Sequence, residues 1–500
     1  MREVHLPSVG VANWVELRRA RAQQHPDRLA FTFLRDGEVE SARLTYGDLG
    51  RQACALAASW QRRGAQPGDR VLLLHPPGVD FILAFFGCLL AGLVAVPSYP
   101  PRLGGRKRET DTRLESIACD ARPQWVSSSA ELYASRQALS AGIPELAAAG
   151  WLAMSESMAA DAVSGWVDPR PTGESVALLQ YTSGSTSTPK GVVVTHGNLL
   201  CNEETIRRAF AQSSESVIVG WLPLYHDMGL IGNVLQPVYV GAHSILMSPM
   251  AFLLRPQRWL MAISHYRATT SGGPNFAYDL CVRKIRPADR EQLDLSSWQV
   301  AFNGSEPVRA QTLERFTEAF APQGFARRAF FPCYGLAEAT LFVSGGSPRE
   351  APVVETFDAA ALEGGRALSP AANETESAAD ETESAVGATA EPPIAPSRHL
   401  VGSGRTWPGQ RLRIVDPETC LECSPGRIGE IWLAGPSVAR GYWRRPEETE
   451  RDYAAHLADS RRGPFLRTGD LGFLHGEELF VTGRLKDLII LRGRNHYPQD

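Results

Sequence analysis

The chain has 500 residues, of which 43% are hydrophobic and 21% are charged, and its formal net charge is −4 at pH 7. This length predicts at least two domains, because single cores rarely serve more than about 100–200 residues. The slight acidity argues against a nucleic acid as the main partner, since phosphate backbones select basic surfaces.

Neither a signal peptide nor a membrane span is expected, because the N-terminus lacks a cationic start followed by an apolar stretch. The longest uncharged apolar run, residues 81–96, is shorter than a membrane span and contains Gly87 and Gly92. A buried helix followed by a buried strand is predicted there. The eight cysteines are scattered, and Cys420 and Cys423 form a C-x-x-C motif without the second pair that zinc would need. A reducing cytoplasm is therefore the expected compartment.

Helical and strand-like segments alternate along most of the chain. Residues 48–62 have the periodicity of an amphipathic helix, and residues 71–74 are typical of a buried strand. Such alternation predicts parallel sheets and an α/β fold for residues 1–400. From 401 to 485 a smaller β-rich part is predicted. Its strands are expected at 411–415, 429–434 and 479–482.

Residues 359–398 differ in composition from the rest of the chain. They are rich in Ala, Glu, Ser, Thr and Pro, and they contain a near-duplication, ANETESA at 372–378 and ADETESA at 379–385. Too little apolar surface is present to offset the entropy of ordering this segment. A mobile acidic loop is predicted.

A Gly/Ser/Thr-rich loop at residues 181–191, YTSGSTSTPKG, is the strongest local signal. It lies between two apolar runs, 176–179 and 192–194, which are expected to be strands. Its backbone N–H groups and hydroxyls are suited to phosphate oxygens, and Lys190 adds a positive charge. The spacing is not that of a Walker A loop. An ordinary loop is the alternative, and the ordered run of hydroxyls ending in Pro-Lys-Gly argues against it.

Two polar clusters follow in the middle of the chain. The sequence GWLPLYHDMG at 220–229 places His226 on a turn, and FNGSEP at 302–307 is a tight turn with polar groups. A lone histidine is usually structural, and the turn alone is a weak signal. Both clusters indicate a functional site only in combination with the other motifs.

Three carboxylate- or cation-bearing clusters complete the set. CYGLAEATL at 333–341 contains Glu338, a possible oxygen ligand for Mg²⁺. LRTGDLG at 466–472 contains Asp470, whose carboxylate can accept hydrogen bonds from both hydroxyls of a ribose. GRLKDLII at 483–490 supplies Arg484 and Lys486. Taken singly, a Glu at a helix start or an Asp after Gly is most often structural.

Together and in this order, these clusters resemble the adenylate-forming superfamily of acyl-CoA synthetases, luciferases and peptide-synthetase adenylation domains. The similarity runs from about residue 44 to the last residue. Within the superfamily, further motifs are similar to the fatty acyl-AMP ligases. They are VAVPSYPP at 94–101, residues 221–232, YGLAEAT at 334–340, GPSVARGYW at 435–443 and RGRNHYPQD at 492–500.

The resemblance implies an α/β large domain of two related parallel-sheet layers, residues 1–400, plus a small β-barrel-like part, 401–485. Residues 486–500 would form the hinge and the start of a small C-terminal domain that is largely absent. The segment 346–399 is a candidate for the insertion that is held to discourage CoA use in fatty acyl-AMP ligases.

The resemblance also implies roles for individual residues. Asp470 and Arg484 would hold the ribose, His226 would lie beside the acyl carboxylate, and Lys486 would be the hinge. Thr186 and Glu338 would hold Mg²⁺. The residues expected around the ATP phosphates are Thr182, Ser183, Gly184, Ser185, Thr186 and Lys190. Those expected near the adenine are Ser305, Glu306, Pro307, Tyr334 and Gly335.

The implied function is the activation of a medium- or long-chain fatty acid with ATP, giving an acyl-adenylate and pyrophosphate. The acyl group would pass to the phosphopantetheine of an acyl carrier protein, in polyketide, nonribosomal peptide or lipid synthesis. A fatty acyl-CoA ligase is the close alternative, and a non-catalytic nucleotide-binding module is another. A scaffold without a nucleotide would leave the loop, Glu338 and Asp470 unexplained.

The sequence departs from the superfamily pattern at three places. Ser187 stands where Gly is common, and Ala337 stands where Thr is common, so one hydroxyl contact is lost. The chain ends at Asp500, before any position that matches the lysine of the small domain. Slow adenylate formation by this 500-residue form is therefore expected.

Overall fold

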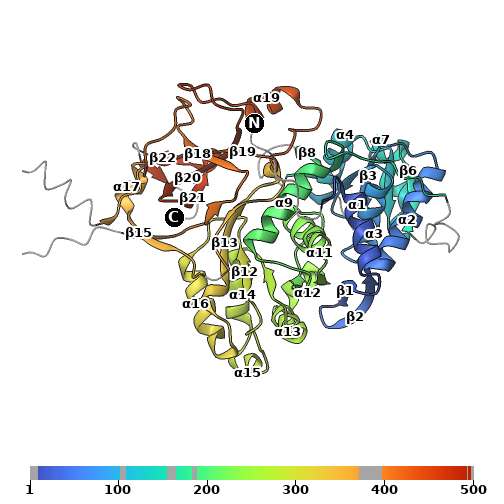
Figure 1. The fold of residues 1–500 in the computed structure, drawn as a ribbon, viewed down its shortest axis with the longest axis horizontal. Coiled ribbons are helices and arrows are strands. Elements are labelled where there is room, and N and C mark those ends of the chain that lie inside the picture. Colours follow the sequence, from blue (N-terminus) through green and yellow to red (C-terminus); the bar gives the residue numbers. More distant parts are fainter. Residues whose placement is uncertain are drawn as a thin grey trace, which may run out of the picture.

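The computed structural model describes residues 10–101, 109–154, 165–182, 189–348, 350–370, 397–491 and 494–496. Three main sheets follow one another along the molecule (Figure 1). The N-terminal part, blue to cyan, lies at one end, the middle of the chain lies in the centre, and the orange and red C-terminal part lies at the other end.

The first sheet has six strands in the order β6-β5-β3-β4-β7-β8. All neighbours pair in parallel except β7 and β8, which are antiparallel. The strands are β3 (Arg70–Leu74), β4 (Val94–Pro97), β5 (Trp125–Ser128), β6 (Gly150–Ala153), β7 (Val176–Tyr181) and β8 (Gly191–Thr195). The helices of this part are α1 (Trp14–Gln24), α2 (Tyr46–Arg62), α3 (Val79–Leu90), α4 (Glu109–Ala121), α5 (Ala130–Ala134), α6 (Arg136–Ser140) and α7 (Pro144–Ala148).

The second sheet has nine strands in the order β17-β14-β13-β12-β11-β9-β10-β1-β2. Its six central strands are parallel, and its edges are antiparallel. The strands are β1 (Leu29–Arg35), β2 (Val39–Thr45), β9 (Val217–Gly220), β10 (His243–Met247), β11 (Thr270–Gly272), β12 (Val300–Asn303), β13 (Phe330–Gly335), β14 (Phe342–Gly345) and β17 (Arg405–Thr406).

Helices and helical turns connect the strands of the second sheet. They include a π-helical turn, η2, between α10 and α11. The helices are α9 (His196–Ala209), α10 (Asp227–Leu230), η2 (Ile231–Leu235), α11 (Gln236–Val240), α12 (Pro249–Leu254), α13 (Gln257–Tyr266), α14 (Asn275–Lys284), α15 (Pro287–Arg290) and α16 (Ala310–Phe320). The short 3₁₀ turns are η3 (Ala321–Gln323), η4 (Arg327–Ala329) and η5 (Ala337–Ala339).

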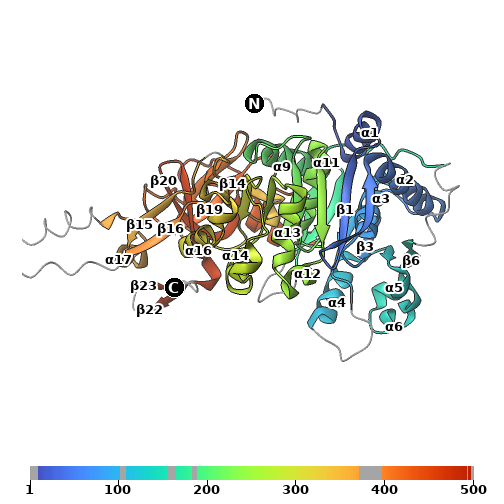
Figure 2. The same cartoon turned by 90° about the horizontal axis from the view of Figure 1, so that it is seen from below.

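The third sheet is antiparallel and has four strands in the order β18-β19-β20-β21. Two small antiparallel sheets of two strands each, β15 with β16 and β22 with β23, lie at the same end of the molecule (Figure 2). The strands are β18 (Arg411–Val415), β19 (Gly429–Ala434), β20 (Leu466–His475), β21 (Glu478–Arg484), β15 (Val354–Asp358), β16 (Ser397–Val401), β22 (Ile489–Leu491) and β23 (Arg494–His496). The helices are α17 (Ala359–Glu363), α19 (Pro446–Tyr453) and the 3₁₀ turn η6 (Leu485–Asp487).

Local hydrogen bonds and apolar runs explain why the predicted elements form. Helix α2 begins with a capping box, in which Thr45 Oγ1 accepts from Asp48 N and the Asp48 carboxylate accepts from Thr45 N. The apolar run 81–96 forms α3 and β4 as expected, and every residue from Phe81 to Leu90 is buried. Across the described part of the chain, no helix is long and apolar enough to cross a membrane.

One hydrophobic core joins the two parallel sheets. Its side chains come from β3 and β7 of the first sheet, from β1 and β9 of the second, and from α3 and α11. Tyr46 adds a polar tie, because its hydroxyl donates to Ala242 O at 2.7 Å and to Pro237 O at 3.1 Å. The α/β fold class with two parallel-sheet layers and a β-rich part is confirmed.

The predicted acidic loop, residues 359–398, is wrong at both of its ends. Residues 371–396, which include both copies of the near-duplication, lie outside the described residues. The start of the predicted loop is instead helix α17, because Asp358 Oδ1 accepts from Ala361 N at 2.7 Å and Leu362 is buried. Its last two residues begin strand β16.

Candidate active site

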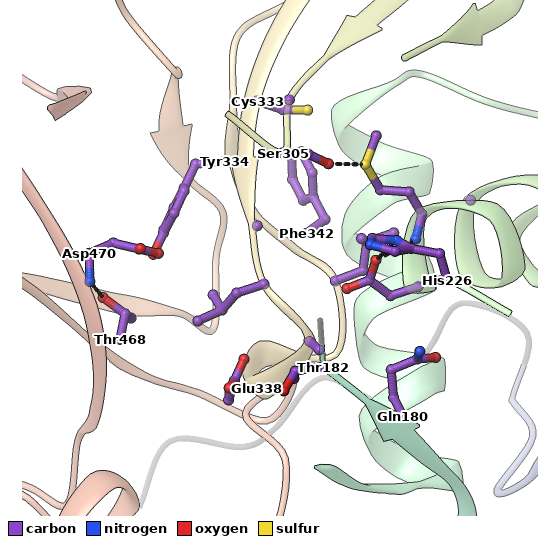
Figure 3. Close-up of a pocket in the computed structure, with 18 of the residues that line it drawn as sticks. Gln180, Thr182, His226, Ser305, Cys333, Tyr334, Glu338, Phe342, Thr468 and Asp470 are labelled. Carbon is purple, nitrogen blue, oxygen red and sulfur yellow. Dashed lines mark hydrogen bonds and ion pairs between the residues drawn. The ribbon is translucent and has the colours of Figure 1, made fainter. Parts of the chain in front are cut away.

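A cavity of about 700 Å³ opens where the three sheets approach one another. Figure 3 shows Glu338 beside Thr182, with Tyr334 and Asp470 on one side and His226 and Gln180 on the other. Ten residues singled out from the sequence line this cavity. They are Thr182, Lys190, His226, Ser305, Tyr334, Gly335, Glu338, Asp470, Arg484 and Lys486.

The parallel strands bring these residues together. Ser305 and the turn that holds His226 follow the carboxyl ends of β12 and β9, and Tyr334 lies at the end of β13. In open parallel sheets, ligands bind at this edge. Asp470 and Arg484 come from β20 and β21, where the two residues are directly paired.

A hydrogen-bonded group forms one wall of the cavity. The Tyr334 hydroxyl donates to Asp470 Oδ2 at 2.7 Å, and Arg484 Nε lies 3.2 Å from Asp470 Oδ1. Asp470 N donates to Thr468 Oγ1 at 3.0 Å, which fixes the turn. Burial raises the pKa of Asp470, and Arg484 opposes that rise. The wall therefore offers a carboxylate, a guanidinium and an aromatic ring to one ligand.

Glu338 is a half-buried carboxylate on η5. Its Oε1 accepts a hydrogen bond from the Tyr442 hydroxyl at 3.0 Å. Burial raises the pKa of Glu338, and none of the causes of that shift is a neighbouring cation. A carboxyl group whose pKa is raised in this way is stabilised either by a proton or by a bound cation.

Lys190 follows the phosphate-suited loop and enters the cavity beside helix α19. Its Nζ lies 2.6 Å from Glu448 Oε2 and 4.4 Å from the centroid of the Tyr442 ring. Asp452 is a second, longer ion-pair partner, at 3.9 Å. The cation is therefore positioned by α19 at the edge of the cavity.

His226 is the N-cap residue of α10 and faces Asp227. Its Nδ1 lies 2.5 Å from Asp227 Oδ1, and the charge of Asp227 raises the pKa of His226. Opposite lies Ser305, whose Oγ contacts Met228 Sδ at 2.5 Å and whose φ of +71° is unusual for a residue other than glycine. The raised pKa favours the positively charged form of His226, which can attract an anion.

Apolar side chains line the deeper part of the same cavity. Phe210 lies at their centre, with its ring centroid 6.1 Å from that of Phe302 and 5.9 Å from that of Phe342. The other apolar lining residues include Ile206, Leu336 and Leu341. This arm would accept an alkyl chain, because burial of each CH₂ group contributes about 0.8 kcal/mol.

A second cavity of about 830 Å³ adjoins the first and shares His226, Met228 and Ser305 with it. Its lining includes three residues of the PSYPP motif noted in the sequence. They are Tyr99, Pro100 and Pro101.

Comparison with known proteins identifies the family. The model of the AMP-binding enzyme family matches residues 18–360 and 381–443. The chain belongs to the AMP-binding enzymes. The matched ranges contain the loop, the cavity clusters around His226, Ser305 and Glu338, and most of both parallel sheets.

Relatives of this AMP-binding enzyme place it among the fatty acyl-AMP ligases, as the motifs predicted. It is 44% identical over 487 residues to the medium-chain-fatty-acid–[acyl-carrier-protein] ligase JamA of Moorena producens, covering 97% of this chain and 79% of JamA. It is 37% identical over 503 residues to the long-chain-fatty-acid–AMP ligase FadD26 of Mycobacterium marinum, covering 97% and 80%. A fatty acyl-adenylate ligase from L. pneumophila, solved with acyl adenylate and pyrophosphate, superposes with a TM-score of 0.85 at 42% identity, covering 96% and 79%.

Two predicted nucleotide residues of this AMP-binding enzyme lie away from the cavity lining. Glu306 Oε1 accepts from Asn275 N at 3.0 Å, and Pro307 O accepts from Asn275 Nδ2 at 2.9 Å. Both residues therefore hold the start of helix α14, and a place near the adenine remains a prediction for them. Four predicted phosphate-loop residues lie outside the described residues. They are Ser183, Gly184, Ser185 and Thr186.

Several cavity residues of this AMP-binding enzyme had no predicted role. Tyr442 and Thr468 stood inside recognised motifs. The contact of Tyr442 with Glu338 joins residues 104 positions apart, whereas Thr468 accepts from Asp470 N within one turn. Gln180 precedes the phosphate-suited loop and donates to Tyr225 O at 3.1 Å. Phe210 and Phe342 of the apolar arm carried no motif signal, because apolar residues are common in any core.

Proposed function

We propose that this enzyme activates a medium- or long-chain fatty acid with ATP, and that the acyl group passes to the phosphopantetheine thiol of an acyl carrier protein. One observation supports this most directly: a single cavity joins a charged, nucleotide-suited wall to an apolar arm lined by Phe210, Phe302 and Phe342. A nucleotide and an alkyl chain would then meet at the turn that carries His226.

The roles of the nucleotide-binding residues follow from their chemistry. Asp470 would accept hydrogen bonds from the ribose hydroxyls while Arg484 orients it, and the Tyr334 ring would lie against the adenine with Ser305 and Gly335 nearby. The phosphates would lie against residues 182–190, with Lys190 as a cationic partner. Glu306 and Pro307 would support the adenine turn.

Mg²⁺ fits the donor set of this site. Glu338 is a half-buried carboxylate with a raised pKa, and the loop residue Thr186 would supply a hydroxyl. Within the described ranges, no group of three or more His, Cys, Asp or Glu side chains is placed to hold a metal ion. Glu338 and Thr186 would therefore share the ion with phosphate oxygens, as Mg²⁺ commonly requires. When bound, the ion would neutralise charge on the phosphates.

The first step forms one bond and breaks another. A carboxylate oxygen of the fatty acid bonds to the α-phosphorus of ATP, and the bond from that phosphorus to the β-phosphate bridge breaks, releasing pyrophosphate. His226 would hold the carboxylate, and Lys190 would stabilise charge that develops on the phosphates. In the second step, the thiol attacks the acyl carbon and AMP leaves with the carboxylate oxygen.

The thiol requires its own approach to the acyl carbon. The second cavity, which shares His226 and Ser305 with the first, is suited to the phosphopantetheine arm. The segment 346–399 would restrict the domain arrangement in which free CoA could react. Lys486 would be the hinge about which the small C-terminal domain moves. The cytoplasm is the proposed compartment, since all eight cysteines are free.

Acid-dependent exchange of pyrophosphate into ATP tests the proposal. We expect exchange with saturated fatty acids, and acyl-adenylate detectable by mass spectrometry. In the presence of a holo acyl carrier protein, the carrier should gain the acyl mass. The absence of exchange with every fatty acid from short to long would refute the proposal.

A further inference from the structure

The apolar arm of the cavity ends on a cluster of polar side chains. Gln212, Gln236 and Thr270 all line the cavity, and their exposed fractions are 4%, 0% and 3%. Gln212 Nε2 donates to Thr270 Oγ1 at 3.2 Å, and Gln212 Oε1 accepts from Gln236 Nε2 at 2.7 Å. We call these three residues the amide floor.

The sheet topology places the amide floor far from the charged wall. Thr270 opens β11 and pairs with Val300, at the amino end of β12, whereas Ser305 follows the carboxyl end of that strand. Strand β12 runs from Val300 to Asn303, which corresponds to roughly 10 Å at about 3.3 Å per residue. Since C–C bonds of about 1.5 Å advance an extended alkyl chain by about 1.3 Å each, this length of strand corresponds to about eight C–C bonds, which suits a medium-chain acid.

The amide floor has hydrogen-bonding capacity that its neighbours leave open. Gln212 Nε2 carries two hydrogens, and among the described residues only Thr270 accepts from them. The Thr270 hydroxyl accepts that bond and donates to none of the described residues. Two donors and the second lone pair of Gln212 Oε1 are therefore available at the end of an apolar arm.

The far side of the amide floor is fixed by a buried acid. The side-chain amide of Gln236 lies 2.5 Å from Glu203 Oε2, and Glu203 is fully buried on α9. Burial raises the pKa of Glu203 well above its usual value. The Gln236 amide therefore lies between Glu203 and Gln212, and Gln212 lies between Gln236 and Thr270 at the end of the cavity.

We propose, on the basis of the function proposed above, that the amide floor selects a medium-length fatty acid that carries an uncharged oxygen group, a hydroxyl or a ketone, at its far end. Such an oxygen accepts from Gln212 Nε2 and Thr270 Oγ1, and a hydroxyl also donates to Gln212 Oε1. A methyl terminus leaves these buried polar groups without partners, which sites of this kind penalise. A charged terminus is excluded, because the floor residues carry no charge to pair with it.

Matched acids of equal length test the amide floor. Acid-dependent pyrophosphate exchange is measured with decanoate, 10-hydroxydecanoate and 9-oxodecanoate. We expect kcat/KM for the oxygenated acids to exceed that for decanoate by about tenfold or more. Thr270→Val and Gln212→Met should each reduce that ratio toward one, mainly through KM for the oxygenated acid. Thr270→Ser keeps the hydroxyl and should keep the ratio.

A control variant separates specificity from general damage. Thr312 is 3% exposed on α16, bonds to Asp279, and is not among the residues that line the cavity. Thr312→Val should leave the ratio unchanged. If decanoate is preferred at equal length, or if Thr270→Val leaves the ratio intact, the floor proposal is overturned while the adenylating function stands. If no acid supports exchange, the adenylating function itself fails.

Discussion

At the residue scale, Glu338 is the group on which ATP use should depend most. Glu338→Gln keeps an oxygen that can accept from the Tyr442 hydroxyl but removes the negative charge. We expect Mg²⁺-dependent pyrophosphate exchange to fall by about 10²–10³-fold, the usual cost of losing one preorganised electrostatic contact. Activity is measured over a Mg²⁺ titration.

Glu478 provides a matched control for that substitution. Burial also raises the pKa of Glu478, and this side chain accepts from Gly404 N at 2.7 Å without lining the cavity. Glu478→Gln should therefore retain exchange activity. Near-normal exchange by Glu338→Gln at saturating Mg²⁺ would remove Glu338 from the metal site.

The same substitution should change stability in a pH-dependent way. Burial raises the folded-state pKa of Glu338 above its unfolded value. Its stabilising contribution is therefore fully present below about pH 4.3 and is lost as the pH rises through the folded pKa. Without nucleotide, Glu338→Gln should unfold at a higher temperature than the parent at pH 7, and the difference should narrow toward pH 4. Thermal melts across this range that show no such narrowing would contradict the raised pKa.

Asp470 should contribute to nucleotide affinity through hydrogen bonds. Asp470→Ala removes the acceptor of the Tyr334 hydroxyl and the partner of Arg484. We expect binding of a non-hydrolysable acyl-adenylate analogue to weaken by about 1.5–3 kcal/mol, the range for hydrogen bonds to a charged group. Calorimetry provides the measurement, with Asp416→Ala as a control on the surface of the same sheet. Unchanged affinity would exclude Asp470 from the ribose site.

At the element scale, strand β15 belongs to the part of segment 346–399 that packs on the third sheet, together with Leu362 of α17. Phe357 is 3% exposed, and its ring centroid lies 5.1 Å from that of Phe473 and 5.4 Å from that of Phe480. Docked β15 would make the domain arrangement that accepts free CoA less populated. The apparent affinity for CoA would then fall in proportion to that population.

Weakening the packing of β15 on the third sheet should therefore increase acyl-CoA formation. We expect Phe357→Ala to raise the ratio of acyl-CoA to acyl carrier protein conjugate, by about tenfold for each ~1.4 kcal/mol of lost docking energy. Phe325→Ala, at an equally buried phenylalanine of the second core, should leave the ratio unchanged. Deletion of residues 372–385 should also do little. A parent enzyme that makes acyl-CoA as readily as the carrier conjugate would favour the acyl-CoA ligase alternative.

At the scale of the whole molecule, local patterns predicted the elements but not their long-range contacts. The periodicity of 48–62 and the apolar run 81–96 were sufficient for α2, α3 and β4, because backbone geometry sets these patterns. The ordered motifs indicated residues that meet in one cavity. The Tyr334–Asp470 contact joins residues 136 positions apart, and no local pattern encodes such a pair.

The apolar arm and the amide floor could not be predicted from the sequence. Gln212 and Thr270 are 58 positions apart and meet only because parallel strands align their amino ends. The family resemblance implies a place near the adenine for Glu306, which remains a prediction, and the structure shows that its side chain accepts from Asn275 N at the start of helix α14. Adjacent residues in a turn can face different ligands, which sequence spacing alone does not distinguish.

The central claim is that this cavity holds ATP and a fatty acid so that a carboxylate oxygen attacks the α-phosphorus. A fatty acid labelled with ¹⁸O in its carboxylate, carried through transfer to a holo acyl carrier protein, tests it most directly. Mass spectrometry of the products should find one ¹⁸O atom in AMP and none in pyrophosphate. Formation of ADP with labelled phosphate, or of AMP without label, would contradict the claim.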